Sequence, residues 1–353
     1  MWDFIFMFVL ILLGFGILVF LHELGHFLTA RCFGVSIKEF AVGMGPTIFS
    51  KRSKKTDTVY ALRALPIGGF VSMVGEDEAS DDHNAFCNKS VWKRMLIVLA
   101  GPAMNLLLGL FLTGCLVMCQ VLTPELNLAS TTVAEFFPDA SSSAQLQVHD
   151  TVLKVGSVSV HTGNELMYEI MNQGHEPVDL LVRRKGEKVL LEDVVFPTFS
   201  ESGAVFGDYD FKVHAEQPTL LNIAKHTFFR SFSNVKTVFD TLVGLIGGRY
   251  GMESVSGPIG VADEIGSVVK EESDFRFLSV LSLGSLLTVN LGVFNLIPFP
   301  ALDGGRFLFL CIEAVRRKPI NRKIEAYVNF AGIVLLFAFM IVVTFKDIVK
   351  LFT

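Results

Sequence analysis

Four long apolar stretches without a charged side chain constrain the fold of this chain more than any other feature of its sequence. No Asp, Glu, Lys or Arg occurs in residues 4–21, 95–123, 277–302 or 326–345. Each stretch has at least about the 18 residues that a helix needs to cross a hydrocarbon core of about 30 Å. The sequence therefore predicts four transmembrane helices and excludes a soluble globular protein.

The charge of the chain and the region before the first stretch narrow the class further. Only 18% of the 353 residues are charged and the net charge is −5, which excludes a nucleic-acid-binding protein. Asp3, and no basic residue, precedes the first stretch, and no small-residue cleavage site follows it. A signal peptide has both a basic start and such a site, so we expect a permanent membrane helix.

Lys and Arg residues around the stretches predict the orientation in the membrane. Ten lie between residues 31 and 94 and six between residues 306 and 323, whereas none precedes the first stretch. Because cytoplasmic loops carry the excess of basic residues, both loops are predicted to be cytoplasmic, with both termini and the segment from 124 to 276 outside. Lys346 and Lys350, after the last stretch, oppose this orientation. The outer segment has no cysteine, so we expect no disulfides there.

Residues 57–73 carry the signature of a β-hairpin. Two β-prone runs flank the turn-forming sequence Pro-Ile-Gly-Gly at residues 66–69. The segment is too apolar for a solvated loop, which favours a hairpin that re-enters the membrane where protein or water covers its backbone. The alternative is an ordinary surface hairpin packed on the helix ends.

Residues 124–197 have the character of a small soluble domain, and an amphipathic segment follows them. Short β-prone runs at 152–155 and 178–182 and a helical pattern at 164–171 predict a mixed α+β domain. Residues 223–246 combine apolar residues at helical spacing with interspersed charges, so we expect a helix lying on the outer membrane surface. A fifth transmembrane helix is the alternative.

His22, Glu23 and His26 form a His-Glu-x-x-His motif at the end of the first apolar stretch. On a helix, two histidines four residues apart share one face and can bind a single Zn²⁺, while Glu23 is placed to take a proton from the attacking water. Ionisable residues within membrane helices mark functional sites, which strengthens this interpretation. Counted from Asp3, His22 lies about 28 Å along the helix and therefore near the cytoplasmic side. An interfacial His-Glu pair that only caps the helix is the alternative.

A catalytic zinc site generally has three protein ligands, so the motif needs one more. Asp303 and Glu325 are acidic residues at the cytoplasmic edges of other predicted helices. Glu325 follows a basic loop and resembles a solvated flank, whereas Asp303 ends an apolar run at the depth of the histidines. We therefore predict Asp303 as the third ligand, with a simple Asp-Gly-Gly turn as the alternative.

Two prolines interrupt the apolar run that leads to Asp303. Pro298 and Pro300 would remove the helical partners of the carbonyls of Phe294 and Leu296. Such open groups, together with the amide of Asn295, are suited to pairing with an unwound substrate strand. A kinked helix whose backbone is satisfied by its neighbours is the alternative.

Three motifs together resemble those of the site-2 protease family of intramembrane zinc metalloproteases. They are Phe-Leu-His-Glu-Leu-Gly-His-Phe at 20–27, Gly-Pro-x-x-Asn at 101–105 and Asn-Leu-x-Pro-x-Pro-x-Leu-Asp-Gly-Gly at 295–305. The small residues of the second motif favour close helix packing, which is the role expected for it. The resemblance implies three roles: zinc binding by His22, His26 and Asp303, general-base catalysis by Glu23, and substrate binding by Asn295 and Pro298.

The same resemblance covers the other segments. It implies that residues 43–73 form membrane re-entrant β-structure that presents the substrate, although Gly43-Met44-Gly45 stands where relatives commonly have Gly-Phe-Gly. It also implies a PDZ domain at 124–197. Three pairs depart from the usual Gly-Leu, Gly-Asp and Asn-Gly, namely Gln145-Leu146, His149-Asp150 and Gly156-Ser157. These departures leave a size-filter or docking role open beside peptide binding.

The sequence thus predicts a polytopic α-helical membrane protein. It has four transmembrane helices, a membrane re-entrant β-hairpin region and one extracytoplasmic PDZ-like α+β domain. The expected segments are transmembrane helix 1 (1–30), the cytoplasmic or re-entrant β region (31–91), helix 2 (92–123), the PDZ-like domain (124–197), an extracytoplasmic linker with the membrane-surface helix (198–276), helix 3 (277–305), a cytoplasmic loop (306–325) and helix 4 (326–346).

The function implied by the resemblance is that of a zinc-dependent intramembrane endopeptidase in the bacterial cytoplasmic membrane, with its active site near the cytoplasmic side. The expected substrates are transmembrane segments of single-span proteins, such as an anti-sigma factor or a signal-peptide remnant. A metal transporter is the first alternative, but it would need polar ligands distributed across several helices to form a path. The predicted ligands here lie at one depth. A non-proteolytic membrane adaptor is the second, and it would have no use for Glu23 between two ligands.

Overall fold

The computed structural model describes residues 2–76, 78–123, 126–201, 203–270 and 275–352. Four helices within them are long and apolar enough to cross a membrane, namely Leu12–Cys32, Val91–Leu122, Arg276–Leu296 and Arg322–Lys350. The predicted number of transmembrane helices is therefore confirmed. The chain forms two compact units, which are described in turn: Met1–Gly109 with Ser256–Arg276 and Leu283–Thr353, and Leu110–Val255 with Phe277–Ser282.

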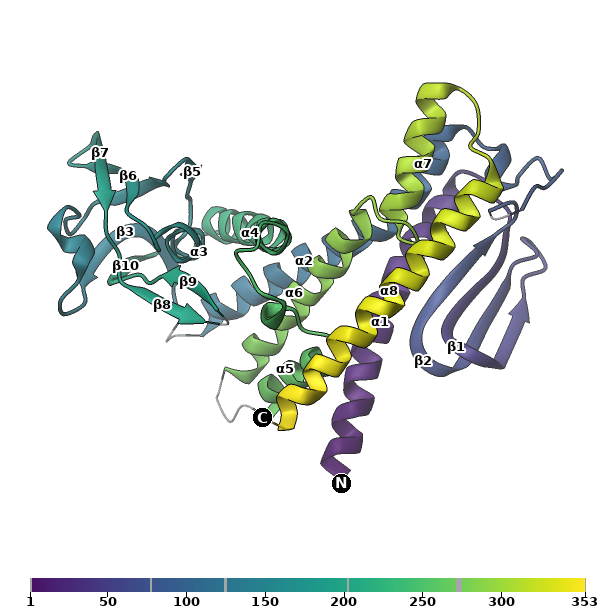
Figure 1. The fold of residues 1–353 in the computed structure, drawn as a ribbon, viewed down its shortest axis with the longest axis horizontal. Helices are drawn as coiled ribbons and strands as arrows, with labels where there is room; N and C mark the ends of the chain where they lie inside the picture. Colours follow the sequence, from purple (N-terminus) through teal and green to yellow (C-terminus); the bar gives the residue numbers. More distant parts are fainter. Residues whose placement is uncertain (1, 77, 124–125, 202, 271–274, 353) are drawn as a thin grey trace. The chain divides into compact units, whose positions relative to one another are not determined.

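The first unit consists of apolar helices and one β-sheet (Figure 1). Its helices are α1 (Trp2–Cys32), the first part of α2 (Val91–Leu122), α5 (Pro258–Lys270), most of α6 (Arg276–Leu296), α7 (Asp303–Arg316) and α8 (Arg322–Phe352). Large apolar side chains of α8, among them Phe337, Phe339 and Ile341, are exposed. Lipid around a transmembrane helix accounts for such a surface.

The third transmembrane helix is shorter than the predicted 277–305. α6 ends at Leu296, and residues 297–302 are not helical. A separate helix, α7, begins at Asp303. The aspartate is therefore the first residue of a new helix, not the last part of a transmembrane one.

The break between α6 and α7 has a local cause. Pro298 and Pro300 have no N–H to continue the helical hydrogen bonds, and Ala301 adopts a φ of +75°. The expectation that the Phe294 carbonyl is left open is wrong, because the N–H of Ile297 donates to it over 3.1 Å. This hydrogen bond from Ile297 to Phe294 closes the last turn of α6, and the helix ends there.

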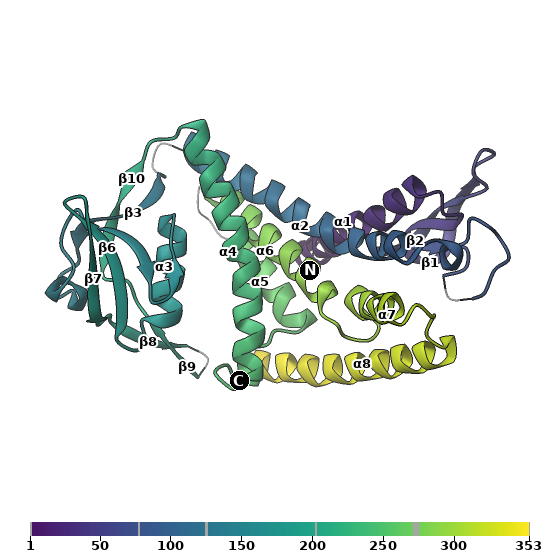
Figure 2. The same cartoon turned by 90° about the horizontal axis from the view of Figure 1, so that it is seen from above.

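The sheet of the first unit lies beside α1 and consists of β1 (Ile37–Arg52) and β2 (Val59–Met73) (Figures 1 and 2). The chain reverses at the predicted residues 66–69 and also at 53–58, but the two runs on either side of 66–69 both pair with residues 39–42 of β1. Phe40 of β1 lies opposite Tyr60 in the first half of β2 and also opposite Val71 in its second half. Residues 59–62 run in the same direction as residues 39–42 and residues 69–72 run in the opposite direction, so the Pro-Ile-Gly-Gly sequence reverses the chain within β2 and the runs on either side of it flank β1.

Close contact with α1 and glycine conformations explain this bend. A Cβ added at Gly16 of α1 would lie 2.4 Å from the carbonyl oxygen of Pro66, so the glycine lets the strand reach the helix. Gly43 and Gly68 adopt φ values of +83° and +73°, which side-chain-bearing residues rarely take. Turn-forming residues at 66–69 thus reverse the chain and also contact a helix, and local sequence reveals only the reversal.

The second unit is built around a sheet covered by α3 (Gly163–Gln173), which lies between that sheet and α4 (Leu220–Ile246) (Figure 2). The strand order is β10-β3-β4-β6-β7, with β5 paired to β4. The strands are β3 (Leu128–Phe136), β4 (Thr151–Val155), β5 (Val158–Ser159), β6 (Val178–Arg184), β7 (Glu187–Val194) and β10 (Phe211–Glu216). Val152, Leu166 and Leu180 are fully buried in its core. The predicted strands at 152–155 and 178–182 and the helix at 164–171 are confirmed.

The sheet of this unit continues beyond the predicted end at residue 197. The predicted start, residue 124, lies outside the described residues, and the first strand begins at Leu128. Residues 198–216 are not the expected linker but form the hairpin of β8 (Thr198–Glu201) and β9 (Ala204–Gly207), followed by β10. β10 pairs antiparallel with β3 and buries Phe211 in the core. A strand of the same chain therefore occupies that edge of β3.

α4 is the amphipathic helix predicted at 223–246. It contacts α3 through polar groups, because Lys236 Nζ lies 2.7 Å from a Glu169 carboxylate oxygen and the Tyr168 hydroxyl donates to Asp240 over 2.9 Å. Exposed apolar side chains recur along it at helical spacing, namely Leu221, Phe228, Phe232, Phe239, Val243 and Ile246. It is not one of the four candidate spans found in the described part of the chain.

Candidate metal centre

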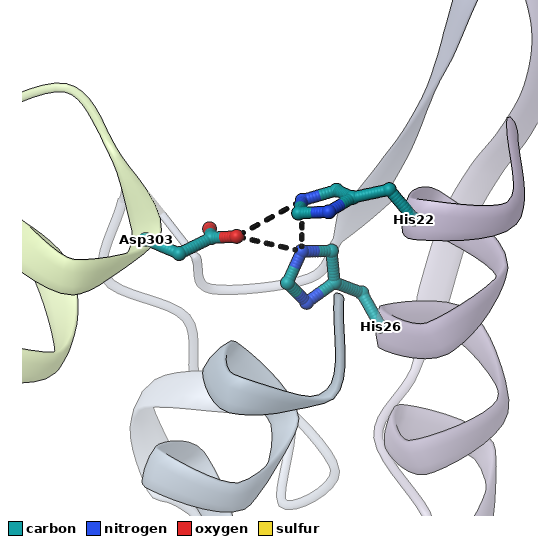
Figure 3. Close-up of side chains that lie close together, drawn as sticks. All are labelled: His22, His26 and Asp303. Atoms are coloured by element: carbon teal, nitrogen blue, oxygen red, sulfur yellow. Dashed lines mark hydrogen bonds and ion pairs between the residues drawn. The ribbon is translucent and has the colours of Figure 1, made fainter. Parts of the chain in front are cut away.

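Two imidazoles of α1 and one carboxylate of α7 meet in the first unit (Figure 3). His22 and His26 are both 7% exposed, and their Nε2 atoms lie 3.2 Å apart. Asp303 Oδ2 lies 3.0 Å from Nε2 of His22 and 3.2 Å from Nε2 of His26. The structure thus brings together the three residues that the sequence predicts as zinc ligands.

Close packing at the start of α7 places Asp303. A Cβ at Gly304 would lie 2.2 Å from the Ile297 carbonyl oxygen, and a Cβ at Gly305 would lie 2.3 Å from that of Phe299. Only glycine allows the first turn of α7 to approach the irregular segment so closely. The two glycines after the aspartate therefore determine where its carboxylate lies.

Two ion pairs hold α7 against other elements of the first unit. Arg94 of α2 makes a bidentate pair with Glu313 of α7, with distances of 2.5 and 3.0 Å. Arg306, one turn after Asp303, pairs with Glu76, which also accepts from the N–H of Met73 over 3.2 Å. Paired guanidinium and carboxylate groups of this kind fix orientation as well as distance.

The space next to the three ligand atoms is kept open by Gly101 of α2. A Cβ at this position would lie 2.3 Å from Nε2 of His26 and 2.7 Å from Nε2 of His22. Asp303 Oδ2 is buried and faces the Nε2 atoms of both histidines. Two imidazole nitrogens and a carboxylate oxygen are the donor set of a three-ligand catalytic zinc site, so these residues fit a zinc ion.

The other ring nitrogens of both histidines contact α2. Nδ1 of His26 lies 2.8 Å from the Ile97 carbonyl oxygen, and Nδ1 of His22 lies 3.0 Å from the side-chain amide of Asn105. Asn105 is fully buried, and its contact with His22 is a second role beside the helix packing expected for its motif. The available sequence signal is a polar residue four positions after a glycine within the charge-free residues 95–123.

Glu23 lies beside the ligand cluster without belonging to it. Its Oε2 accepts a hydrogen bond from the backbone N–H of Val71 in β2 over 3.1 Å. The half-buried carboxylate is thus held by the sheet and not by α1 alone. Because the partner is a backbone N–H, no side chain in the sequence could have pointed to it.

The other predicted site residues lie outside the cluster. Asn295 Nδ2 donates to the Leu291 carbonyl of its own helix over 2.9 Å. Pro298 lies in the irregular segment between α6 and α7. Glu325, the alternative third ligand, lines a separate cavity together with Arg94 and is not part of the metal-binding group found in the described residues.

The chain is similar to known proteins over most of its length. Residues 10–339 match peptidase family M50. A protein of Clostridium acetobutylicum named as a zinc metalloprotease is 33% identical over 97% of both chains. The zinc metalloprotease RasP of Geobacillus kaustophilus is 30% identical over 96% of both chains. The regulator of sigma-W protease RasP of Bacillus subtilis is 29% identical, over 96% of this chain and 97% of that protein.

Proposed function

This chain belongs to peptidase family M50, and on that premise we propose that His22, His26 and Asp303 bind its zinc ion and that Glu23 is its general base. The chain is a multi-pass membrane protein and a zinc metalloendopeptidase of the site-2 protease type. One observation carries the assignment of residues. Three buried or half-buried donor atoms converge beside a glycine whose missing Cβ leaves room for an ion.

The chemistry of peptide-bond hydrolysis divides between the metal and Glu23. A zinc ion bound there would supply the positive charge that polarises the peptide carbonyl and acidifies a water molecule. Glu23 would take the proton of the attacking water and return it to the leaving amine. The Val71 N–H, 3.1 Å from Oε2, holds the carboxylate for both transfers.

The break between α6 and α7 supports a role of Asn295 and Pro298 in substrate binding. A transmembrane helix must unwind before one of its peptide bonds can be attacked, and an unwound strand needs partners for its backbone groups. Residues 297–302 form irregular backbone directly before Asp303. We assign to Asn295 and Pro298 the binding of the unwound strand next to the metal.

The substrates that fit such a site are transmembrane segments of single-span proteins. One relative is named for the regulation of sigma-W, which supports an anti-sigma factor as one class of substrate. Signal-peptide remnants are the second class, because they too are short, single apolar helices. In both cases the substrate enters from the lipid and not from water.

Exposed apolar side chains support contact of the β1–β2 sheet with the membrane. Ile48 is 68% exposed and Phe49 is 62% exposed, and Met44, Leu62 and Leu65 are also exposed. A sheet in water would hide such side chains, whereas a membrane re-entrant sheet would present them to lipid. Because β2 also holds Glu23, this sheet is suited to presenting a substrate strand beside the general base.

The sheet of the second unit is PDZ-like in its mixture of elements, but its β3 edge is occupied. Peptide-binding PDZ domains take up their ligand as an added strand at an exposed sheet edge. β10 of the same chain already pairs with β3. This arrangement supports a docking or size-filter role over capture of a peptide at that edge.

The exposed apolar side chains of α4 support its placement on the outer membrane surface. A helix with an apolar face and a polar face lies at the boundary between lipid and water. We place both termini and residues 124–276 on the outer side of the cytoplasmic membrane and the metal centre near its cytoplasmic side. Basic residues in the loops at 31–94 and 306–323 carry this part of the proposal.

The two alternative functions are disfavoured by the site itself. A metal transporter needs ligands at several depths, whereas the described residues contain one metal-binding group. A membrane adaptor needs no general base, and Glu23 is oriented by a hydrogen bond beside that group. Proteolysis accounts for both features.

Substitution of Glu23 by Gln tests the proposed function. Gln retains an oxygen that accepts from the Val71 N–H and leaves all three ligands unchanged. Loss of a general base costs about 10²–10⁴ in rate, so cleavage of a single-span model substrate by purified Glu23→Gln should nearly vanish. Zinc content, measured by elemental analysis, should stay at about one per chain. Wild-type cleavage by this variant would refute the role of Glu23.

A further inference from the structure

The side-chain amide of Asn105 contacts His22, one of the proposed zinc ligands, and packing alone does not explain this contact. Asn105 is fully buried in α2, one turn after Gly101. Gly101 faces the Nε2 atoms of both histidines, while the Asn105 amide faces Nδ1 of His22 at 3.0 Å. Gly101 and Asn105 of α2 thus lie next to the two ring nitrogens of His22.

The second histidine shows what such a contact does. Nδ1 of His26 lies 2.8 Å from the carbonyl oxygen of Ile97, which can only accept a hydrogen bond. The proton of the neutral ring must therefore be on Nδ1, and Nε2 is left with a free lone pair. Metal-binding histidines are commonly oriented by a hydrogen bond of this kind on the second nitrogen.

The side-chain amide of Asn105 can present either its nitrogen or its oxygen to His22. If Nδ2 donates to Nδ1, the His22 proton is on Nε2, the atom that faces His26 and Asp303. If Oδ1 faces Nδ1, the ring proton is on Nδ1 and Nε2 can bind a metal. The positions of amide oxygen and nitrogen are exchanged by a half-turn of the group. Of the two amide atoms, Oδ1 is the one placed without a described hydrogen-bond partner.

We propose that Asn105 is a positioning residue that accepts the Nδ1 proton of His22 through Oδ1 and thereby keeps Nε2 available for zinc. This inference rests on the proposed function, because it assumes that His22 is a ligand. α2 then orients both ligand histidines without supplying a ligand, one through a backbone carbonyl and one through a side chain. Loss of such a hydrogen bond commonly lowers metal affinity about 10–100-fold.

Three substitutions of the full-length protein test the role of Asn105. Asn105→Leu has a similar size but no acceptor, and Asn105→Ala removes the amide without adding bulk. Asn105→Asp restores an oxygen that accepts from Nδ1 and cannot donate to it when ionised. A control is Ser285→Ala, which removes another fully buried polar group whose hydroxyl donates to the Gly109 carbonyl of α2 over 3.2 Å.

Zinc affinity is measured in detergent by competition with a chromophoric chelator, and Co²⁺ spectra and melting of the metal-free proteins are recorded beside it. We expect about 10–100-fold weaker zinc binding and an altered Co²⁺ spectrum for Asn105→Leu and Asn105→Ala. Asn105→Asp should restore both, and Ser285→Ala should leave both unchanged. A purely structural role would lower the melting temperature of the metal-free protein without rescue of zinc binding by Asp.

Two results would overturn the inference. One is wild-type zinc affinity in both Asn105→Leu and Asn105→Ala, and the other is an equal loss of affinity in Asn105→Asp. Asp303→Ala, measured in parallel, separates this failure from that of the proposed function. If Asp303→Ala loses zinc while the Asn105 variants retain it, the metal centre stands and the role of Asn105 falls. If Asp303→Ala retains zinc, the proposed set of three ligands falls, and the Asn105 variants still decide the role of the contact with His22.

Discussion

Substitution of Gly101 by Ala removes the space proposed for the metal without changing any proposed ligand. The added Cβ would lie 2.3 Å from Nε2 and 2.6 Å from Cε1 of His26, and 2.7 Å from Nε2 of His22. Non-bonded carbon atoms approach each other to about 3.5 Å, so the rings would have to move by about 1 Å. Functional constellations tolerate displacements of only about 0.5 Å.

The expected magnitude follows from this displacement. Loss of a supporting hydrogen bond alone costs about 10–100-fold in metal affinity. A methyl group in contact with two ligand atoms should cost at least the upper end of that range, about 100-fold. The fold should tolerate the change, because Ala favours a helix by about 1 kcal/mol over Gly while overpacking costs about 1–3 kcal/mol.

Elemental analysis of the purified variant measures the effect, with cleavage of a single-span substrate measured beside it. Gly109→Ala is a matched control, since it makes the same change in the same helix but brings the Cβ within 2.5 Å of a methyl group of Val289. We expect Gly101→Ala to lose zinc and activity and Gly109→Ala to keep both. Full zinc content and activity in Gly101→Ala would refute the location assigned to the ion.

Three further predictions concern stability, each measured by thermal unfolding in detergent. Arg94→Leu leaves Glu313 without its bidentate partner and should cost about 2–4 kcal/mol, and removing both charges should restore most of it. Asp347→Ala removes the acceptor of the N–H groups of Gly257 and Gly260 and should cost about 2–3 kcal/mol, whereas Asp347→Asn should cost less. Burial lowers the pKa of His226 from 6.5 although Glu216 opposes the shift, so the unfolded chain binds the proton more readily. Stability should therefore fall as the pH drops through about 6.5, and His226→Gln should lack this component; equal pH profiles would contradict the assignment.

The sequence reveals the parts of this protein whose causes are local. Charge-free length alone predicts four membrane helices, because the hydrocarbon core sets that length. The spacing of His22 and His26 places both imidazoles on one face of a helix. Asp303 could be added because an unfinished zinc site requires a third ligand, and the structure brings it within 3.2 Å of both histidines.

The parts that the sequence misses depend on contacts between distant segments. Pro and Gly at residues 66–69 predict the reversal of the chain there, but not that residues 39–42 of β1 lie between the two runs on either side of it. The pairing of β10 with β3 joins residues about 80 positions apart, beyond the reach of local patterns. The orientation of Glu23 depends on the backbone N–H of Val71, which has no sequence signature at all.

The part that α2 plays in the metal centre has a consequence for genetics. This helix supplies none of the three proposed ligands, yet Gly101 leaves the space proposed for the ion and the Ile97 carbonyl contacts one of the two histidines. A search for inactive alleles should therefore recover substitutions in α2 that spare every residue of the His-Glu-x-x-His and Asp-Gly-Gly motifs. At Ile97 only the backbone matters, so the side chain should accept exchange for other apolar residues. At Gly101 only glycine should retain activity. A variant with all of its proposed ligands can therefore be inactive.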